Sequence, residues 1–358
     1  MTLSPVFRSQ DAVRLLAKQG VWARLEGDME AQAEAIRVVH ADLEMILGEQ
    51  FRTEAPHVPS ASEATTPGGL HFLQEYFFLI LFRSIFASVG VPEDRLGLYT
   101  ELNFCIKGTI TSADNIFDDQ AKTLLPLAPH AGARFMSILQ LMSFERLLRR
   151  ALERGRGNDI LNGAQCEAIQ RELLDRMTSI GRLEGSEEEG VEEIPNPEEM
   201  VERVHRIRGG DLFTLAFAGP KVLEEDDLAE KMVAAESAVA QLGTAFQIVD
   251  DLTDFEFDLG RRSHNLLTSQ IHHHGSEEEQ AALTRFRTGE PVPEGIVESL
   301  FLTSAGSVLD IAYSEARSAF IGLAELGHWL EPSFAEQVVH AIVGLDGVAR
   351  MEALTVGS

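Results

Sequence analysis

The stretch Phe246–Asp258 reads FQIVDDLTDFEFD, and it says more about the fold than any other part of the chain. On an α-helix, where each residue turns the chain by about 100°, its aspartates and its one amide share a single stripe. The stripe consists of Gln247, Asp250, Asp251, Asp254 and Asp258. Apolar side chains flank it, which predicts a buried helix. Because like charges one turn apart repel and buried unpaired carboxylates are costly, a cation must face this stripe.

A second acidic stretch, Asp114–Asp119, reads DNIFDD. On a helix Asp114 and Asp118 lie on one face, and Lys122 falls on the same stripe. Carboxylate oxygens on two helices suit Mg²⁺, which proteins hold with one or two carboxylates together with substrate phosphates. Acid-rich helix faces are usually solvated, and Asp114 and Asp118 alone would be interpreted in that way. Two such helices, one of them with apolar flanks, favour a metal site.

Helical patterning continues through most of the chain. Its 358 residues are 44% apolar and 24% charged, which are the values of a globular protein. Apolar residues recur at helical spacing, and runs of alternating β-branched residues are missing. We therefore predict an all-α, single-domain bundle of ten or more helices over residues 67–358, preceded by a helical extension and loop over residues 1–66 with breaks at Gly20 and Gly27. Helices are expected over residues 70–90, 94–121, 131–155, 162–180, 197–219, 225–259, 278–287, 294–327 and 332–350.

Charge and cysteine usage exclude several classes of protein. The chain has 57 acidic and 30 basic residues, and its net charge of −27 argues against a nucleic-acid binder, which needs clustered Lys and Arg. Two cysteines, Cys105 and Cys166, fit a reducing compartment. Residues 1–14 show no signal-peptide pattern, and the most apolar stretch, 70–91, contains charged residues. We expect a cytoplasmic protein without a nucleic-acid partner or a transmembrane segment.

Two further segments are unusual in composition. Glu184–Glu202 holds nine Glu and no Lys or Arg, which predicts a solvated acidic loop between helices. His272–His274 is followed by Gly275 and is predicted to lie in a surface loop. The chain contains no His/Cys grouping with zinc spacing and no Gly-rich phosphate-binding motif.

These features resemble the trans-isoprenyl diphosphate synthase (polyprenyl synthetase) family of the class I isoprenoid synthase superfamily. This family carries two Asp-rich motifs on facing helices of an all-α bundle. Phe246–Asp254 is similar to the second motif, including Gln247. Asp114–Asp118 is similar to the first motif, D-D-x-x-D, with Asn115 in its second position. The resemblance spans residues 68–330, and it implies a homodimer that ionises an allylic prenyl diphosphate with several Mg²⁺ ions brought by the diphosphate.

The resemblance also implies roles for individual residues. The predicted metal ligands are Asp114, Asp118, Asp250 and Asp254, with Asp251 as a further catalytic carboxylate. Arg208 begins the segment RGGDLF, where the family has a Lys-Thr pair four residues before Leu-Phe. The predicted diphosphate-binding residues are Lys122, Arg208, Gln247 and Arg261. The predicted apolar pocket wall consists of Ile110, Phe117, Phe213 and Phe246.

Two departures from the family pattern leave the reaction open. Gly68–Phe72 has no Lys or Arg where the family's isopentenyl diphosphate site has Gly-Lys-x-x-Arg. Lys122 is a lone cation where the family has an Arg-Arg pair after the first motif. We expect a Mg²⁺-dependent prenyltransferase. The alternative is a terpene-synthase-like lyase or cyclase that does not use isopentenyl diphosphate, and a non-catalytic synthase subunit is the third.

Overall fold

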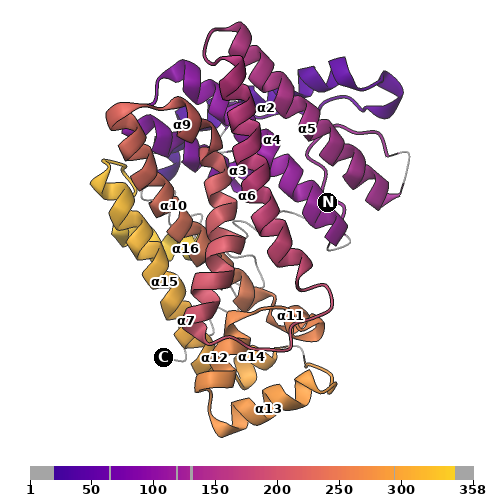
Figure 1. The fold of residues 1–358 in the computed structure, drawn as a ribbon, viewed down its shortest axis with the longest axis vertical. Helices are drawn as coiled ribbons and strands as arrows, with labels where there is room; N and C mark the ends of the chain where they lie inside the picture. The colour runs from indigo at the N-terminus through magenta and orange to yellow at the C-terminus, as the bar shows by residue number, and fades with distance from the viewer. Residues whose placement is uncertain (1–19, 64–65, 118–119, 130–131, 294, 343–358) are drawn as a thin grey trace. The chain divides into compact units, whose positions relative to one another are not determined.

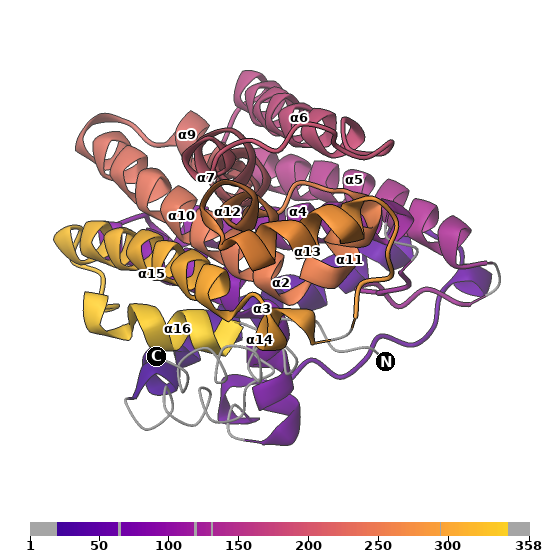
Figure 2. The same ribbon diagram turned by 90° about the horizontal axis from the view of Figure 1, so that it is seen from below.

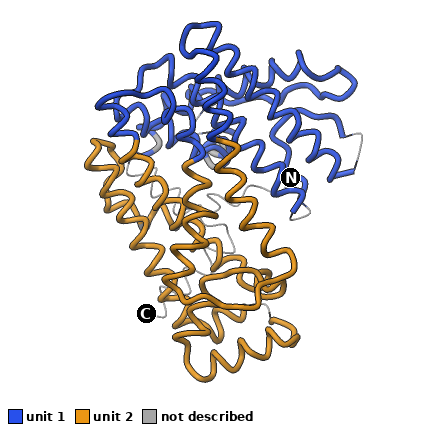
Figure 3. Tube along the Cα trace, in the orientation of Figure 1, with its two compact units in different colours: residues 1–4, 20–172, 215–232 blue, residues 5–19, 173–214, 233–358 orange. Residues whose placement is uncertain are grey.

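The computed structural model describes residues 20–63, 66–117, 120–129, 132–293 and 295–342, and within these residues it contains helices and no β-strand (Figure 1). The α-helices run from α2 to α16, so the prediction of an all-α fold with ten or more helices is confirmed. The described chain forms two compact units (Figure 3). Unit 1 comprises residues 20–172 and 215–232, and unit 2 comprises residues 173–214 and 233–342. The predicted domain boundary near residue 66 stays a prediction.

Unit 1 is built around a pair of long antiparallel helices joined by a loop. Its helices are α2 (Val21–Ile46), α3 (Pro67–Val89), α4 (Glu93–Phe117), α5 (Ala133–Gly157), the first part of α6 (Gly163–Gly185), α9 (Ala218–Leu223) and the start of α10 (Asp226–Thr253). Helix α4 packs against α5, and the Phe144 ring lies where a side chain at Gly108 would stand. The rings of Phe104 and Phe144 meet edge to face with centroids 5.6 Å apart. This contact forms the apolar core beneath the first Asp-rich stretch.

Unit 2 contains the remainder of α6 and α10 and the whole second Asp-rich stretch. Its other elements are α7 (Pro197–Met200), η3 (Val201–Asp211), α8 (Leu212–Thr214), α11 (Phe255–Arg261), α12 (Leu266–His274), α13 (Glu277–Arg287), α14 (Ile296–Ser299), α15 (Leu302–Glu325) and α16 (Ala335–Ile342). Helix α15 packs against α12 and runs beside α16 (Figure 2). The buried rings of Phe255 and Phe301 pack edge to face, 5.5 Å apart, and fasten the start of α11 to the core.

Segment η3 is a π-helix of 11 residues that packs closely on α10. A Cβ atom built on Gly209 would stand 2.2 Å from the backbone oxygen of Gly243, and one built on Gly243 would stand 2.2 Å from that of Gly209. Only glycine fits at either position, because real Cβ atoms do not approach an oxygen this closely. π-Helical turns are rare and frequently occur at functional sites. The glycine pair therefore brings the backbone of η3 against α10 beside the acidic stripe.

Several local predictions differ from the structure. Gly27 does not break a helix but lies inside α2, whereas Gly20, with φ of 75°, immediately precedes that helix. His272–His274 is not a loop: it is the last turn of α12, which is capped by Asn265 at its start and by Gly275 at its end. The helix predicted over 225–259 divides at Asp254, between α10 and α11.

Helix α10 is apolar over much of its length. Among the described helices it is the one long and apolar enough, by length and composition, to cross a membrane. In its most apolar window 61% of the residues are buried inside the protein. A core helix of a water-soluble protein passes the same test, so this is weak evidence for a membrane span.

Candidate functional site

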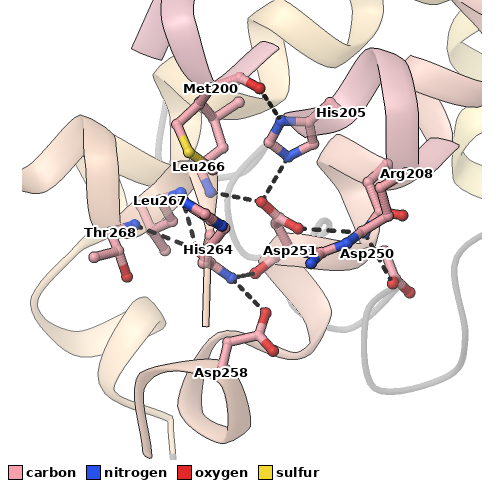
Figure 4. A network of polar contacts seen from close by, with 12 residues as sticks. Met200, His205, Arg208, Asp250, Asp251, Asp258, His264, Leu266, Leu267 and Thr268 are labelled. Atoms are coloured by element: carbon pink, nitrogen blue, oxygen red, sulfur yellow. Dashed lines mark hydrogen bonds and ion pairs between the residues drawn. The ribbon is translucent and has the colours of Figure 1, made fainter. Parts of the chain in front are cut away.

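Asp251 is the centre of a buried network in unit 2 (Figure 4). Its side chain is 2% exposed, and its Oδ2 accepts hydrogen bonds from His205 Nε2 at 2.7 Å and from the Leu266 amide at 2.5 Å. Its Oδ1 accepts a longer bond, 3.4 Å, from Gln247 Nε2. Both oxygens of Asp251 are therefore engaged by donors of the protein itself.

His205 is the side chain that faces Asp251 from η3. Its Nδ1 lies 3.0 Å from the Met200 carbonyl oxygen, and its Nε2 faces the Asp251 carboxylate. A carbonyl oxygen only accepts hydrogen bonds, so Nδ1 donates to Met200 and Nε2 is the ring nitrogen left to contact Asp251. The imidazole and the carboxylate are therefore in direct contact, and both side chains are less than 3% exposed.

Asn265 ties the three helices around this pair together. As the N-cap of α12, its Oδ1 accepts hydrogen bonds from the amides of Leu267 and Thr268. Its Nδ2 donates to the Asp251 carbonyl oxygen at 2.7 Å and to Asp258 Oδ2 at 2.9 Å. One amide side chain therefore fixes the end of α10, the middle of α11 and the start of α12.

Asp250 and Asp254 form the outer part of the stripe. Asp250 is partly buried and Asp254 is exposed. The Asp254 backbone amide donates to the Asp250 carbonyl oxygen at 2.9 Å, so the two residues are one helical turn apart. Burial and the neighbouring carboxylates of Asp254 and Asp251 raise the pKa of Asp250 to about 8. Burial also raises the pKa of Asp258 well above its ordinary value. The stripe has more negative charge than the surrounding protein compensates.

Arg208 lies on the same η3 segment as His205 and is held by two glutamates. Its Nε donates to Glu184 Oε1 at 2.7 Å, and its Nη2 donates to Glu187 Oε1 at 2.6 Å. Glu187 also accepts hydrogen bonds from the His264 amide at 3.0 Å and from His264 Nδ1 at 2.5 Å. Although burial opposes ionisation, His264 and Arg208 lower the pKa of Glu187 to about 2. Burial would lower the pKa of Arg208, but Glu184 and Glu187 raise it.

The described part of the first Asp-rich stretch, residues 114–117 in unit 1, has one exposed and one buried polar side chain. Asp114 is exposed on α4, whereas Asn115 is 2% exposed. The Asn115 amide donates to the Lys122 carbonyl oxygen at 2.8 Å and accepts from the Lys122 amide at 3.0 Å. Gln140 adds a second clamp, since its Nε2 donates to the same carbonyl at 3.2 Å and its Oε1 accepts from the Leu124 amide. Asp118 lies outside the described residues.

The predicted pocket-wall residues fall into two pairs, one in each unit. Phe213 is buried and Phe246 partly buried in unit 2, and their ring centroids are 5.7 Å apart. In unit 1, Ile110 is partly buried and Phe117 is 51% exposed. The predicted diphosphate-binding residues divide similarly: Lys122 is in unit 1, and Arg208, Gln247 and Arg261 are in unit 2. Arg261 is exposed, with its guanidinium 5.3 Å from the ring centroid of Phe257.

The sequence pattern does not predict a role for four residues of this site, which are His205, Glu187, His264 and Asn265. Only Asn265 has a local signal, because an Asn directly before a helical apolar run is a typical N-cap. His205 lies 46 residues from Asp251, and Glu187 lies 77 residues from His264, so neither pairing has a sequence spacing that predicts it. The prediction that the acidic segment is solvated is wrong at Glu187, which is buried.

Comparison with known proteins identifies the fold. No protein-family model and no curated protein sequence matches the chain. A polyprenyl synthase from Caulobacter crescentus, solved with calcium and isoprenyl diphosphate, is similar over 89% of this chain and 97% of its own, with 15% identity and a TM-score of 0.55. A geranylgeranyl pyrophosphate synthetase from Pyrococcus horikoshii is similar over 94% and 98%, with 14% identity and a TM-score of 0.55.

A third solved structure agrees with these two. A geranylgeranyl pyrophosphate synthase from Lactobacillus brevis is similar over 87% of this chain and 96% of its own, with 12% identity and a TM-score of 0.58. At such identities the likeness shows the fold. The chain has the all-helical fold of the isoprenyl diphosphate synthases, as its two Asp-rich stretches led us to expect.

Proposed function

We propose that this protein is a Mg²⁺-dependent prenyltransferase that ionises an allylic prenyl diphosphate and transfers the prenyl group to an acceptor. The observation that carries the proposal is the outer pair of the acidic stripe, Asp250 and Asp254, one turn apart at the end of α10. The similar fold of solved prenyl diphosphate synthases supports it.

The charge balance of the site fits a divalent cation. The aspartates of the stripe, together with Glu184 and Glu187, outnumber the basic side chains that contact them, which are Arg208, His205 and His264. Burial and the carboxylates of Asp254 and Asp251 raise the pKa of Asp250, and a cation bound at this carboxylate would oppose that shift. Among the described residues no three His, Cys, Asp or Glu side chains converge on one metal position. Mg²⁺ takes one or two carboxylates and completes its shell with water and substrate phosphate oxygens.

Within this proposal Asp250 and Asp254 hold the metal, while Asp251 keeps them in place through its bonds to His205 and the Leu266 amide. Asp114 and Asp118 are proposed as the ligands from the first stretch. Bound Mg²⁺ would neutralise the diphosphate as it leaves. Arg208 offers a planar guanidinium, suited to bidentate phosphate recognition, where negative charge develops. Gln247, Lys122 and Arg261 are proposed as further diphosphate contacts.

The aromatic residues of the site protect the allylic cation. The Phe213–Phe246 pair offers ring faces, which attract a cation without reacting with it. Ile110 and Phe117 are proposed to complete this wall. Excluding water matters because a free allylic cation would be hydrolysed.

A lyase or cyclase is the second candidate, and one specific feature favours it. Gly68 and Gly69 lie in the first turn of α3, which is capped by Thr66, and the next described polar side chain, His71, is exposed. This segment offers no Lys or Arg to a second diphosphate. An enzyme that uses only the allylic substrate has no need of such cations.

A product analysis separates the two candidates. Purified protein is incubated with Mg²⁺ and geranyl, farnesyl or geranylgeranyl diphosphate, with and without isopentenyl diphosphate. Longer prenyl diphosphates that form only with isopentenyl diphosphate indicate prenyl transfer. Hydrocarbon or alcohol products formed without it indicate the lyase. Absence of diphosphate release under all conditions contradicts both.

Replacement of Asp250 tests the metal assignment directly. We expect Asp250→Asn to lower the rate of diphosphate release at least about 100-fold, because it removes a ligand that acts on the leaving group. Asp227→Asn, at an exposed position in the first turn of the same helix, is the matched control and should leave the rate unchanged. Equal rates in the two variants would show that Asp250 holds no catalytic metal.

We also propose that the protein is a cytoplasmic homodimer. Analytical ultracentrifugation of the purified protein would test its oligomeric state.

A further inference from the structure

The acidic segment that the proposed chemistry leaves unused contains one unusual glutamate. Of the nine Glu in residues 184–202, only Glu187 is buried, at 8% exposure. Acidic loops normally keep their carboxylates in water, since burying a charge is costly without a partner. The burial of Glu187 therefore reflects a specific interaction.

That interaction covers one edge of the Arg208 guanidinium. Glu184 contacts Nε at 2.7 Å and Glu187 contacts Nη2 at 2.6 Å, so the two carboxylates together engage one edge of the guanidinium. Arginine recognises phosphate with the same geometry: two phosphate oxygens accept hydrogen bonds side by side along one edge of the guanidinium. The arginine side chain is 14% exposed in this arrangement.

The segment is held from its other side by the connection between α11 and α12. Glu187 accepts two hydrogen bonds from His264, and the Val191 amide donates to the Arg262 carbonyl oxygen at 2.8 Å. Gly190, with φ of 79°, allows the tight turn between these two contacts. These contacts do not involve Arg208, so they give Glu187 a partner, His264, that it can keep when Arg208 binds something else.

We propose that Glu187 and Glu184 are a built-in competitor for the diphosphate group, which must displace them from Arg208 in order to bind. The inference rests on the proposed function, in which Arg208 contacts the substrate's diphosphate. It makes Glu187 a residue that determines specificity. An anion that arrives without metal ions meets two carboxylates in addition to the acidic stripe. A diphosphate that carries Mg²⁺ is not repelled in this way and can take their place.

The test measures binding of inorganic diphosphate in the presence of MgCl₂ by calorimetry. We expect Glu187→Gln to bind diphosphate about tenfold more tightly than the wild type, since one charge-assisted bond no longer has to be broken. Glu188→Gln removes the same charge from the exposed neighbouring residue and should change the affinity less than twofold. In the Glu187→Gln background, Arg208→Gln should remove the gain.

Every outcome decides the question. Binding by Glu187→Gln that is equal to or weaker than the wild type, with an unchanged circular dichroism spectrum, overturns the proposal, as does an equal gain in Glu188→Gln. If Glu187→Gln does not fold, Glu184→Gln, at a partly exposed position, takes its place with the same expectation. A wild type that releases diphosphate from a prenyl substrate while Glu187→Gln shows no gain would leave the proposed function standing without the competitor. If Glu187→Gln binds diphosphate more tightly but the wild type turns over no prenyl substrate, the competitor is supported and the proposed function is contradicted.

Discussion

Replacement of Gly243 by Ala tests the close contact that brings η3 to the acidic stripe. The added Cβ would stand 2.2 Å from the Gly209 carbonyl oxygen and 2.9 Å from the Phe213 ring. An ordinary carbon–oxygen contact needs roughly 3.3 Å or more, so the two helices would have to separate by about 1 Å. Because the obstacle is backbone, no side-chain rotation relieves it.

The expected loss of stability follows from two opposing effects. Ala in a helix is favoured over Gly by about 1 kcal/mol, whereas overpacking of a tight interior contact costs about 1–3 kcal/mol and sometimes more. With two backbones in contact we expect the upper end, a net loss of about 2 kcal/mol. For a unit of this size that lowers the midpoint of thermal unfolding by about 4–8 °C.

The matched control is Gly181→Ala. Gly181 lies within α6, and nothing stands within 4 Å of a Cβ built there, so the midpoint should be unchanged or slightly raised. Thermal unfolding followed by circular dichroism compares the two variants. A shift of about 1 Å at the site should also lower diphosphate release by about 100-fold in Gly243→Ala. Equal stability and activity of the two variants would refute the close helix contact.

Two further predictions concern Asn115 and His328. Asn115→Asp should destabilise the protein by about 1–3 kcal/mol in denaturant unfolding, because a carboxylate cannot donate to the Lys122 carbonyl oxygen; a variant as stable as wild type would contradict the clamp. Burial lowers the pKa of His328 to about 4, and its Nδ1 accepts a bond from the Leu330 amide, so the folded state holds a neutral ring. The unfolded chain then binds the proton below pH of about 6.5, and stability should fall by about 3 kcal/mol between that pH and about pH 4. His328→Asn, which retains an acceptor, should reduce this loss, and an identical pH profile in the variant would show that His328 does not cause it.

The sequence predicted the acidic stripe well because its members are close in the chain. Gln247, Asp250 and Asp251 lie within about one helical turn, so a helical periodicity alone places them on one face. The same reasoning indicated that a cation must oppose them. The sequence could not predict the contact between Asp251 and His205, because this contact depends on how η3 packs on α10 through Gly209 and Gly243. The π-helical winding of η3 also has no signal in a pattern read at a period of 3.6 residues.

The failures have a common physical cause. Glu187 carries the same charge as its eight neighbours in the acidic segment, and only its contacts with Arg208 and His264 distinguish it. For His272–His274 the sequence predicts a loop, because composition says little about a helix whose stability comes from its Asn265 cap and from packing.

By itself the sequence determined that the protein is all-helical, acidic and built around two Asp-rich stretches, because these properties follow from composition and from spacing within single helices. The tertiary structure decided which polar and charged groups contact one another. It pairs Asp251 with His205, gives the Asn115 amide to the Lys122 backbone, and places Glu184 and Glu187 on Arg208. The reason is that the free energy of a buried charge depends on partners a few ångströms away in space, and those partners are dozens of residues away in the chain in the cases of His205 and Glu187.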